Sequence, residues 1–337
     1  MAITEAVREG RLEFRVGQLV EVRSAEEIMA TLDENGELDS LPFMPEMLRY
    51  CGRRLRVSKV ANKLCDTMTR SGIRRMSDAV HLADVRCDGS SHGGCEAACL
   101  MYWKTAWLRP ADEATESALD DVTVEPPATP VVLLQLTRRP PADDGTVRFR
   151  CQVTELLRAA PDSLPSRNLA QYVGDVRIGN ASPTWSARAL FVALFNRYQD
   201  RSRATLPKWL LIRGGRQWGF LKGTAGKTPT GRTDLRPGEL VRIKSKHEIE
   251  KTLDAALLNR GMGFDAEMAR FCGRTARVAR RVEKILDENT GRMIHMKNPC
   301  IVLEGIVCEG AFHANCPRGI PAYWREIWLE RIEEPAT

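Results

Sequence analysis

Four residues with the chemistry of metal ligands occur twice in this chain at one spacing. Both sets read C-x35-C-x4-H-x2-C. Three thiolates and one imidazole are the usual ligands of a closed tetrahedral zinc site. The sequence therefore predicts two zinc ions per chain. The predicted ligands are Cys51, Cys87, His92 and Cys95 in the first set, and Cys272, Cys308, His313 and Cys316 in the second.

The two ligand sets belong to an internal repeat. Residues 17–109 align without a gap with residues 238–330 at a constant offset of 221, and 31 of the 93 paired positions are identical. A competing interpretation is that these are buried thiols and packed histidines, because free cysteine often behaves as a small buried hydrophobe. Four coincident positions in two diverged copies favour the ligand interpretation.

Iron–sulfur clusters are the main alternative, because they use thiolate ligands that histidine can partly replace. The string CDGSSH at residues 87–92 resembles the CDGSH iron–sulfur motif. It departs from that motif by one extra serine and by the absence of an upstream C-x-C pair, and the second copy reads CEGAFH. The alternative function is therefore a metalloenzyme or redox protein that holds two iron–sulfur clusters on the same eight residues.

The first repeat carries soft ligands that the second lacks. Cys65, His81 and Cys99 correspond to aliphatic residues, namely Leu286, Val302 and Ile320. A functional metal site keeps an open position, whereas a structural one is closed. If only one copy is active, its centre is expected in the first repeat, near Cys87, His92 and Cys95. No role is assigned to Cys151 and Cys300.

Short strands and capped helices must position these ligands. Each repeat opens with an alternating strand and a capping box, Ser24 to Glu27 and Ser245 to Glu248. Further strands are predicted at 53–60, 80–87 and 102–108 in the first copy, and at 275–282, 300–308 and 323–329 in the second. The predicted fold is α+β and mainly β, with two tandem SH3-like small barrels joined by a partly helical middle region.

Composition divides the chain into five segments. An acidic, proline-rich stretch follows the first repeat, and a basic, glycine-rich stretch precedes the second. Between them, VRFRCQVTEL (147–156) predicts a strand, and Ser182 followed by Pro183 predicts the start of a helix. The segments are repeat 1 at 14–110, a linker at 111–145, a strand plus helical connector at 146–200, a basic connector at 201–237 and repeat 2 at 238–333.

Charge and hydropathy limit the partners. The 337-residue chain has a net charge of +6 and a pI near 8.8, so only a weak nucleic-acid contact is expected at RRLR (53–56) or RVARR (277–281). No apolar run approaches the length of a membrane span, and no apolar signal core opens the sequence, so a cytoplasmic protein without a membrane contact is expected. The partner is an unidentified small molecule or protein. The repeated pairs Lys63 with Lys284 and Asp66 with Asp287 are expected at the surface or in turns, with polar site residues as the alternative.

A family resemblance adds to this interpretation. The segments LPFMPEMLRYCGRRLRV, RCDGSSHGGCEAACL and YWKTAWL resemble a bacterial family with cysteine-rich tandem repeats. The resemblance covers the first repeat well and the second more loosely. It implies that the cysteine-rich motif recurs in nature, and it implies no defined activity.

Overall fold

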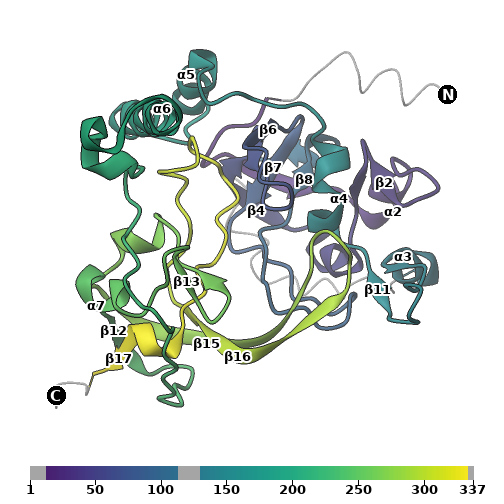
Figure 1. Cartoon of the computed structure of the whole chain (residues 1–337). Helices are drawn as coiled ribbons and strands as arrows, with labels where there is room; N and C mark the ends of the chain where they lie inside the picture. The colour runs from purple at the N-terminus through teal and green to yellow at the C-terminus, as the bar shows by residue number, and fades with distance from the viewer. Residues whose placement is uncertain (1–12, 113–129, 333–337) are drawn as a thin grey trace, which may run out of the picture. The chain divides into compact units, whose positions relative to one another are not determined.

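The structure, a computed structural model, describes residues 13–112 and 130–332. The chain forms two compact units. Unit 1 comprises residues 1–182, 284–294 and 316–318, and unit 2 comprises the remaining residues. The fold is mixed α+β with mostly sheet, which confirms that part of the prediction (Figure 1). No helix of the described residues is long and apolar enough to cross a membrane.

Unit 1 is built on a five-stranded sheet in the order β8-β7-β4-β1-β9. Figure 1 shows β4, β7 and β8 side by side within it. The chain between β7 and β8 holds three of the four predicted ligands of repeat 1. The strands of unit 1 are β1 (Leu19–Val22), β2 (Glu37–Leu38), β3 (Leu41–Pro42), β4 (Arg54–Val60), β5 (Lys63–Cys65), β6 (Ile73–Arg75), β7 (Ala79–Leu82), β8 (Trp103–Lys104), β9 (Leu108–Pro110), β10 (Arg138–Arg139) and β11 (Arg148–Phe149). Its helices are α2 (Ala25–Met29), α3 (Val131–Leu136), α4 (Gln152–Ala159) and α5 (Leu169–Arg177), with 3-10 turns at Pro45–Tyr50 and Thr105–Trp107.

Unit 2 contains a sheet in the order β16-β15-β12-β17. Equivalent residues pair in both sheets, because Leu19 opposes Arg56 in unit 1 and Leu240 opposes Arg277 in unit 2. The strands are β12 (Leu240–Ile243), β13 (Leu258–Asn259), β14 (Met262–Gly263), β15 (Thr275–Leu286), β16 (Met293–Leu303) and β17 (Leu329–Arg331), with residues 284–294 assigned to unit 1. The helices are α6 (Pro183–Thr205) and α7 (Lys246–Glu250), with 3-10 turns at Lys208–Leu210, Ile212–Gly215, Met268–Arg270 and Glu326–Trp328.

Both predicted capping boxes are confirmed. The hydroxyl of Ser24 accepts a hydrogen bond from the Glu27 amide at 3.2 Å, and the Glu27 carboxylate accepts one from the Ser24 amide at 2.9 Å. Ser245 and Glu248 repeat this exchange at 3.3 and 2.9 Å. Such a cap stabilises a helix start by about 1 kcal/mol, which a helix as short as α2 or α7 requires.

The middle of the chain differs from its predicted elements at residues 147–156, and α3 and β10 lie within the predicted linker at 111–145. The strand expected over 147–156 is wrong, because only Arg148–Phe149 is extended and α4 begins at Gln152. The Thr154 hydroxyl accepts a hydrogen bond from the Cys151 amide at 3.1 Å, and this local cap competes with strand pairing. The helix predicted from Pro183 is confirmed as α6. Residues 113–129 of the predicted linker lie outside the described residues.

Lys63 contradicts its predicted surface position. Its side chain is fully buried, and its ammonium group lies 2.6 Å from the carboxylate of Asp175 in α5. The prediction was wrong because the charge that permits this burial comes from a partner 112 residues away in sequence. The indoles of Trp103 and Trp107 are also fully buried, so the repeated aromatic residues form the core.

Candidate metal centre

The loop between β7 and β8 brings Cys87 and His92 together. The Cys87 amide donates to the Cys99 carbonyl at 2.9 Å, and the His92 amide donates to the Gly89 carbonyl at 3.1 Å. These bonds fold the loop so that Cys87 Sγ lies 3.5 Å from His92 Nε2. Two of the predicted ligands are therefore adjacent in unit 1.

Unit 2 contains the same loop backbone. The Cys308 amide donates to the Ile320 carbonyl at 2.8 Å, and the His313 amide donates to the Gly310 carbonyl at 3.0 Å. Each bond joins residues equivalent to those in unit 1. The repeated spacing therefore specifies a loop conformation as well as a set of side chains.

Gly89 is needed for this loop. Its φ is +72°, and a Cβ atom there would lie 2.1 Å from the Cys95 carbonyl oxygen. We expect Gly89→Ala to destabilise unit 1 by several kcal/mol, because a left-handed alanine costs roughly 1–2 kcal/mol and the steric clash adds to it. Gly52→Ala is the matched control, since Gly52 has a φ of +77° with no atom within 4 Å of the added Cβ. Urea unfolding of both variants measures the difference, and equal losses would contradict a steric role for Gly89.

A buried carboxylate completes the group at Cys87 and His92. Glu46 Oε1 lies 3.4 Å from Cys87 Sγ and 3.5 Å from His92 Nδ1, and the glutamate side chain is 1% exposed. One ligand atom from each of the three residues lies within 4.8 Å of the others. The Ser91 hydroxyl also donates to Glu46. In the described part of the chain, no lysine or arginine pairs with this carboxylate.

The equivalent carboxylate in unit 2, that of Glu267, forms a salt bridge with an arginine. Glu267 pairs with Arg270 at 2.9 Å, and Arg270 also reaches Glu309 at 2.7 Å. In unit 1 the equivalent Arg49 pairs with Asp88 at 2.7 Å. Glu46 has no such arginine partner among the described residues, and a divalent cation beside the thiol and the imidazole would supply the positive charge that Arg270 supplies in unit 2.

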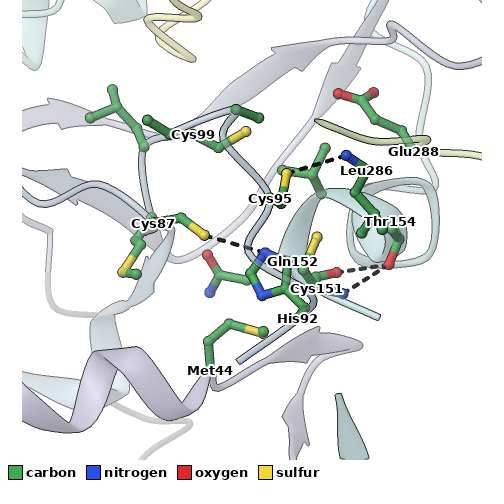
Figure 2. A pocket seen from close by; sticks show the side chains of 15 residues that line it. Met44, Cys87, His92, Cys95, Cys99, Cys151, Gln152, Thr154, Leu286 and Glu288 are labelled. Carbon is green, nitrogen blue, oxygen red and sulfur yellow. Dashed lines mark hydrogen bonds between the residues drawn. The ribbon is translucent and has the colours of Figure 1, made fainter. Parts of the chain in front are cut away.

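Four thiols line one pocket in unit 1. The pocket is bounded by Cys87, Cys95, Cys99 and Cys151, together with His92. Figure 2 shows these side chains around it. Cys95 Sγ accepts a hydrogen bond from the Leu286 amide at 3.2 Å, and Cys151 is the N-cap residue of α4. Burial raises the pKa of the Cys151 thiol, so a bound divalent cation would have to displace its proton.

Burial sets the protonation of the metal-free site. It raises the pKa of the Cys87 thiol, and the Glu46 carboxylate raises this pKa further. Burial also lowers the pKa of His92, although Glu46 acts in the opposite direction. Cys87 is thus a neutral thiol at neutral pH, and a bound divalent cation would displace its proton.

The structure places the predicted ligands differently in the two repeats. Cys87, His92 and Cys95 line one pocket, whereas Cys51 belongs to the hydrophobic core of unit 1 and is not among the lining residues. Cys272, Cys308 and His313 belong to unit 2, and Cys316 belongs to unit 1. His313 Nε2 lies 3.5 Å from Asp265 Oδ1, and Cys316 Sγ accepts a hydrogen bond from the Cys65 amide at 3.1 Å.

Three residues of this site, Glu46, Cys99 and Cys151, were not among the predicted zinc ligands. Glu46 had a signal, because Glu46 and Glu267 are an identical pair five residues before a repeated cysteine. Cys99 was predicted to be an extra soft ligand of repeat 1, but nothing in the sequence placed it beside Cys87 and His92. Cys151 had no signal, because it lies outside both repeats and only the fold brings α4 to the pocket.

No family model, no curated protein and no solved structure matches the chain.

Proposed function

We propose that this chain is a metal-binding protein in which zinc organises a binding or scaffolding module. The proposed principal centre is in unit 1, with Cys87, His92, Cys95 and Cys151 as ligands. The observation that carries the proposal is the group of Glu46, Cys87 and His92, in which Cys87 is half-buried and the other two are buried, and whose ligand atoms lie within 4.8 Å of one another. Burying a thiol, an imidazole and a carboxylate together is costly unless a cation offsets their desolvation.

Glu46 has a defined part in this proposal. Its carboxylate lies on the Nδ1 side of His92, while Nε2 lies on the Cys87 side. Ligating histidines commonly donate their second ring N–H to a carboxylate, which orients the ring and strengthens its basicity. Glu46 would thus hold the ring, and Nε2 would bind the ion.

The repeat extends the proposal to a second zinc ion in unit 2, with Cys272, Cys308 and His313 as ligands. The supporting observation is that the loop of Cys308 and His313 has the same backbone hydrogen bonds as the loop of Cys87 and His92.

We also propose that each repeat is an SH3-like barrel. The strand order β8-β7-β4-β1-β9 supports this, because the last strand pairs with the first and the others follow as a meander.

One observation favours the alternative of an iron–sulfur redox protein or metalloenzyme. Four thiols line a single pocket in unit 1, and four cysteines are the usual ligands of such clusters. His92 would then lie beside the cluster or replace one thiolate.

Metal analysis decides between zinc and an iron–sulfur cluster. Protein purified anaerobically without chelator is expected to be colourless and to contain zinc. His92→Ala should lower the zinc content by one ion per chain, and His313→Ala should do the same at the second set. Iron with visible absorption from thiolate ligation would favour the alternative. Protein free of both metals would contradict the proposed function.

A further inference from the structure

Unit 2 contains a basic pocket that shares no residue with the proposed metal centres. It encloses about 350 Å³, part of it open to solvent, which suits a small molecule. Every lining residue belongs to unit 2, and the charged ones are Arg232, Arg260, Arg281, Arg325 and Glu326. Four positive charges against one negative charge make this pocket, here called the arginine pocket, attractive to anions.

The equivalent positions of unit 1 hold an ion pair instead. Lys104 lies 2.9 Å from the Asp39 carboxylate and donates to the Ser77 carbonyl at 3.3 Å. The lysine side chain is buried, so the carboxylate offsets a largely desolvated charge. Repeat 1 therefore satisfies the cation at this position with a carboxylate of its own.

Repeat 2 replaces the acid of this pair by a second base. Arg325 occupies the position of Lys104, and it donates to the equivalent backbone carbonyl, that of Asn298. Arg260 occupies the position of Asp39, and the hairpins β2–β3 and β13–β14 that precede and follow these residues pair equivalently. Arg325 also donates to the Arg260 carbonyl at 3.2 Å. The turn is thus kept while its charge is reversed, and among the described residues no carboxylate pairs with either arginine.

The single carboxylate of the arginine pocket already has partners. Glu326 accepts from the Arg281 guanidinium at 2.8 Å and from the Thr233 amide at 2.6 Å. The second bond fixes the backbone next to Arg232, whose exposed side chain lines the pocket without a carboxylate partner in the described part of the chain. Pairing of Arg281 with Glu326 therefore leaves three arginines for a ligand.

We propose that the arginine pocket binds the phosphate group of a small molecule, with Arg232, Arg260 and Arg325 as its partners. Guanidinium groups match phosphate oxygens through parallel N–H donors and stay charged at physiological pH. Three guanidinium groups on three separate segments suit the three oxygens and about two charges of a phosphate group, whereas a carboxylate offers two coplanar oxygens and one charge. This site goes beyond the proposed metal-binding function and does not depend on it.

Calorimetric titration of the full-length chain with inorganic phosphate tests this proposal. The wild-type chain is expected to bind phosphate at a single site. Arg260→Asp/Arg325→Lys introduces the pair found in repeat 1, so it should fold, and it should bind phosphate at least about 10-fold more weakly because charged hydrogen-bond donors are lost. Arg201→Asp is the matched control, since it changes the net charge equally at an exposed position of α6 outside the pocket. It should bind like the wild-type chain.

Arg232→Ala is the second variant, and it serves if the double variant does not fold. Its side chain is exposed, so the substitution should leave the fold unchanged and still weaken phosphate binding. Absence of phosphate binding by the wild-type chain, or equal binding by the pocket variants and Arg201→Asp, would overturn the inference. Zinc content should be the same in every variant. Phosphate bound at a zinc ion would therefore not respond to these substitutions, and that result would also overturn the inference.

Two sources of phosphate are separated by competition. Glycerol phosphate, a small phosphate monoester, should displace inorganic phosphate from the wild-type chain and should lose affinity in the pocket variants. A short single-stranded DNA is the comparison. Binding of this DNA that the pocket variants abolish, together with no binding of glycerol phosphate, would assign the arginines to a nucleic-acid contact and contradict a small-molecule site.

Discussion

Cys151→Ser is expected to weaken zinc binding in unit 1, whereas Cys51→Ser is expected to leave it unchanged. Both cysteines are buried in the same hydrophobic core, but only Cys151 lines the pocket with Cys87 and His92. A structural zinc site is worth roughly 10–16 kcal/mol over four ligands, so losing one ligand should cost about 3 kcal/mol. That corresponds to an affinity about 100-fold lower.

Competition with a chelator measures this difference on the full-length protein. Cys51→Ser is a close control, because Cys51 and Cys151 are both buried thiols of one hydrophobic core and burial raises the pKa of each. Serine should cost stability similarly at either position, so thermal melts of the metal-free proteins correct for packing. Loss of zinc from Cys51→Ser but not from Cys151→Ser would contradict this prediction. The fourth ligand would then be Cys51, as the repeat predicts.

Asp175→Asn is expected to destabilise unit 1 by about 3–5 kcal/mol, because it leaves the Lys63 charge buried and uncompensated. Both side chains are fully buried, and they lie 2.6 Å apart. The Gln171 side chain accepts from the same ammonium group at 3.2 Å. Burial lowers the pKa of Lys63, and Asp175 opposes that shift, so the aspartate is what keeps the lysine charged.

Two further variants make this prediction specific. Lys63→Met with Asp175→Leu removes both charges, and it should be much less destabilising than Asp175→Asn alone. Asp200→Asn breaks the half-exposed pair with Arg203 and should change stability by about 0.5 kcal/mol or less. Urea unfolding gives the free energies. Equal effects of Asp175→Asn and Asp200→Asn would contradict a structural role for the buried pair.

Local features of this protein could be predicted from its residues. The capping boxes at Ser24 and Ser245 need only a serine and a glutamate three positions apart, and the structure contains both. The loop glycine at position 89 has the left-handed backbone that a tight C-x4-H-x2-C turn needs. These features involve neighbours within a few residues, whose geometry the spacing alone determines.

The sequence by itself determined the repeat, its offset and the pairing of Cys87 with His92, because these depend on spacing along one segment. Only the tertiary structure decided which other groups meet them. Glu46 and Cys151 reach the pocket from a 3-10 turn and from α4, and Asp175 reaches Lys63 from α5. The physical reason is that desolvated thiols, carboxylates and ammonium groups must find a partner in space. Burial, unlike spacing, is decided by packing between segments distant in sequence.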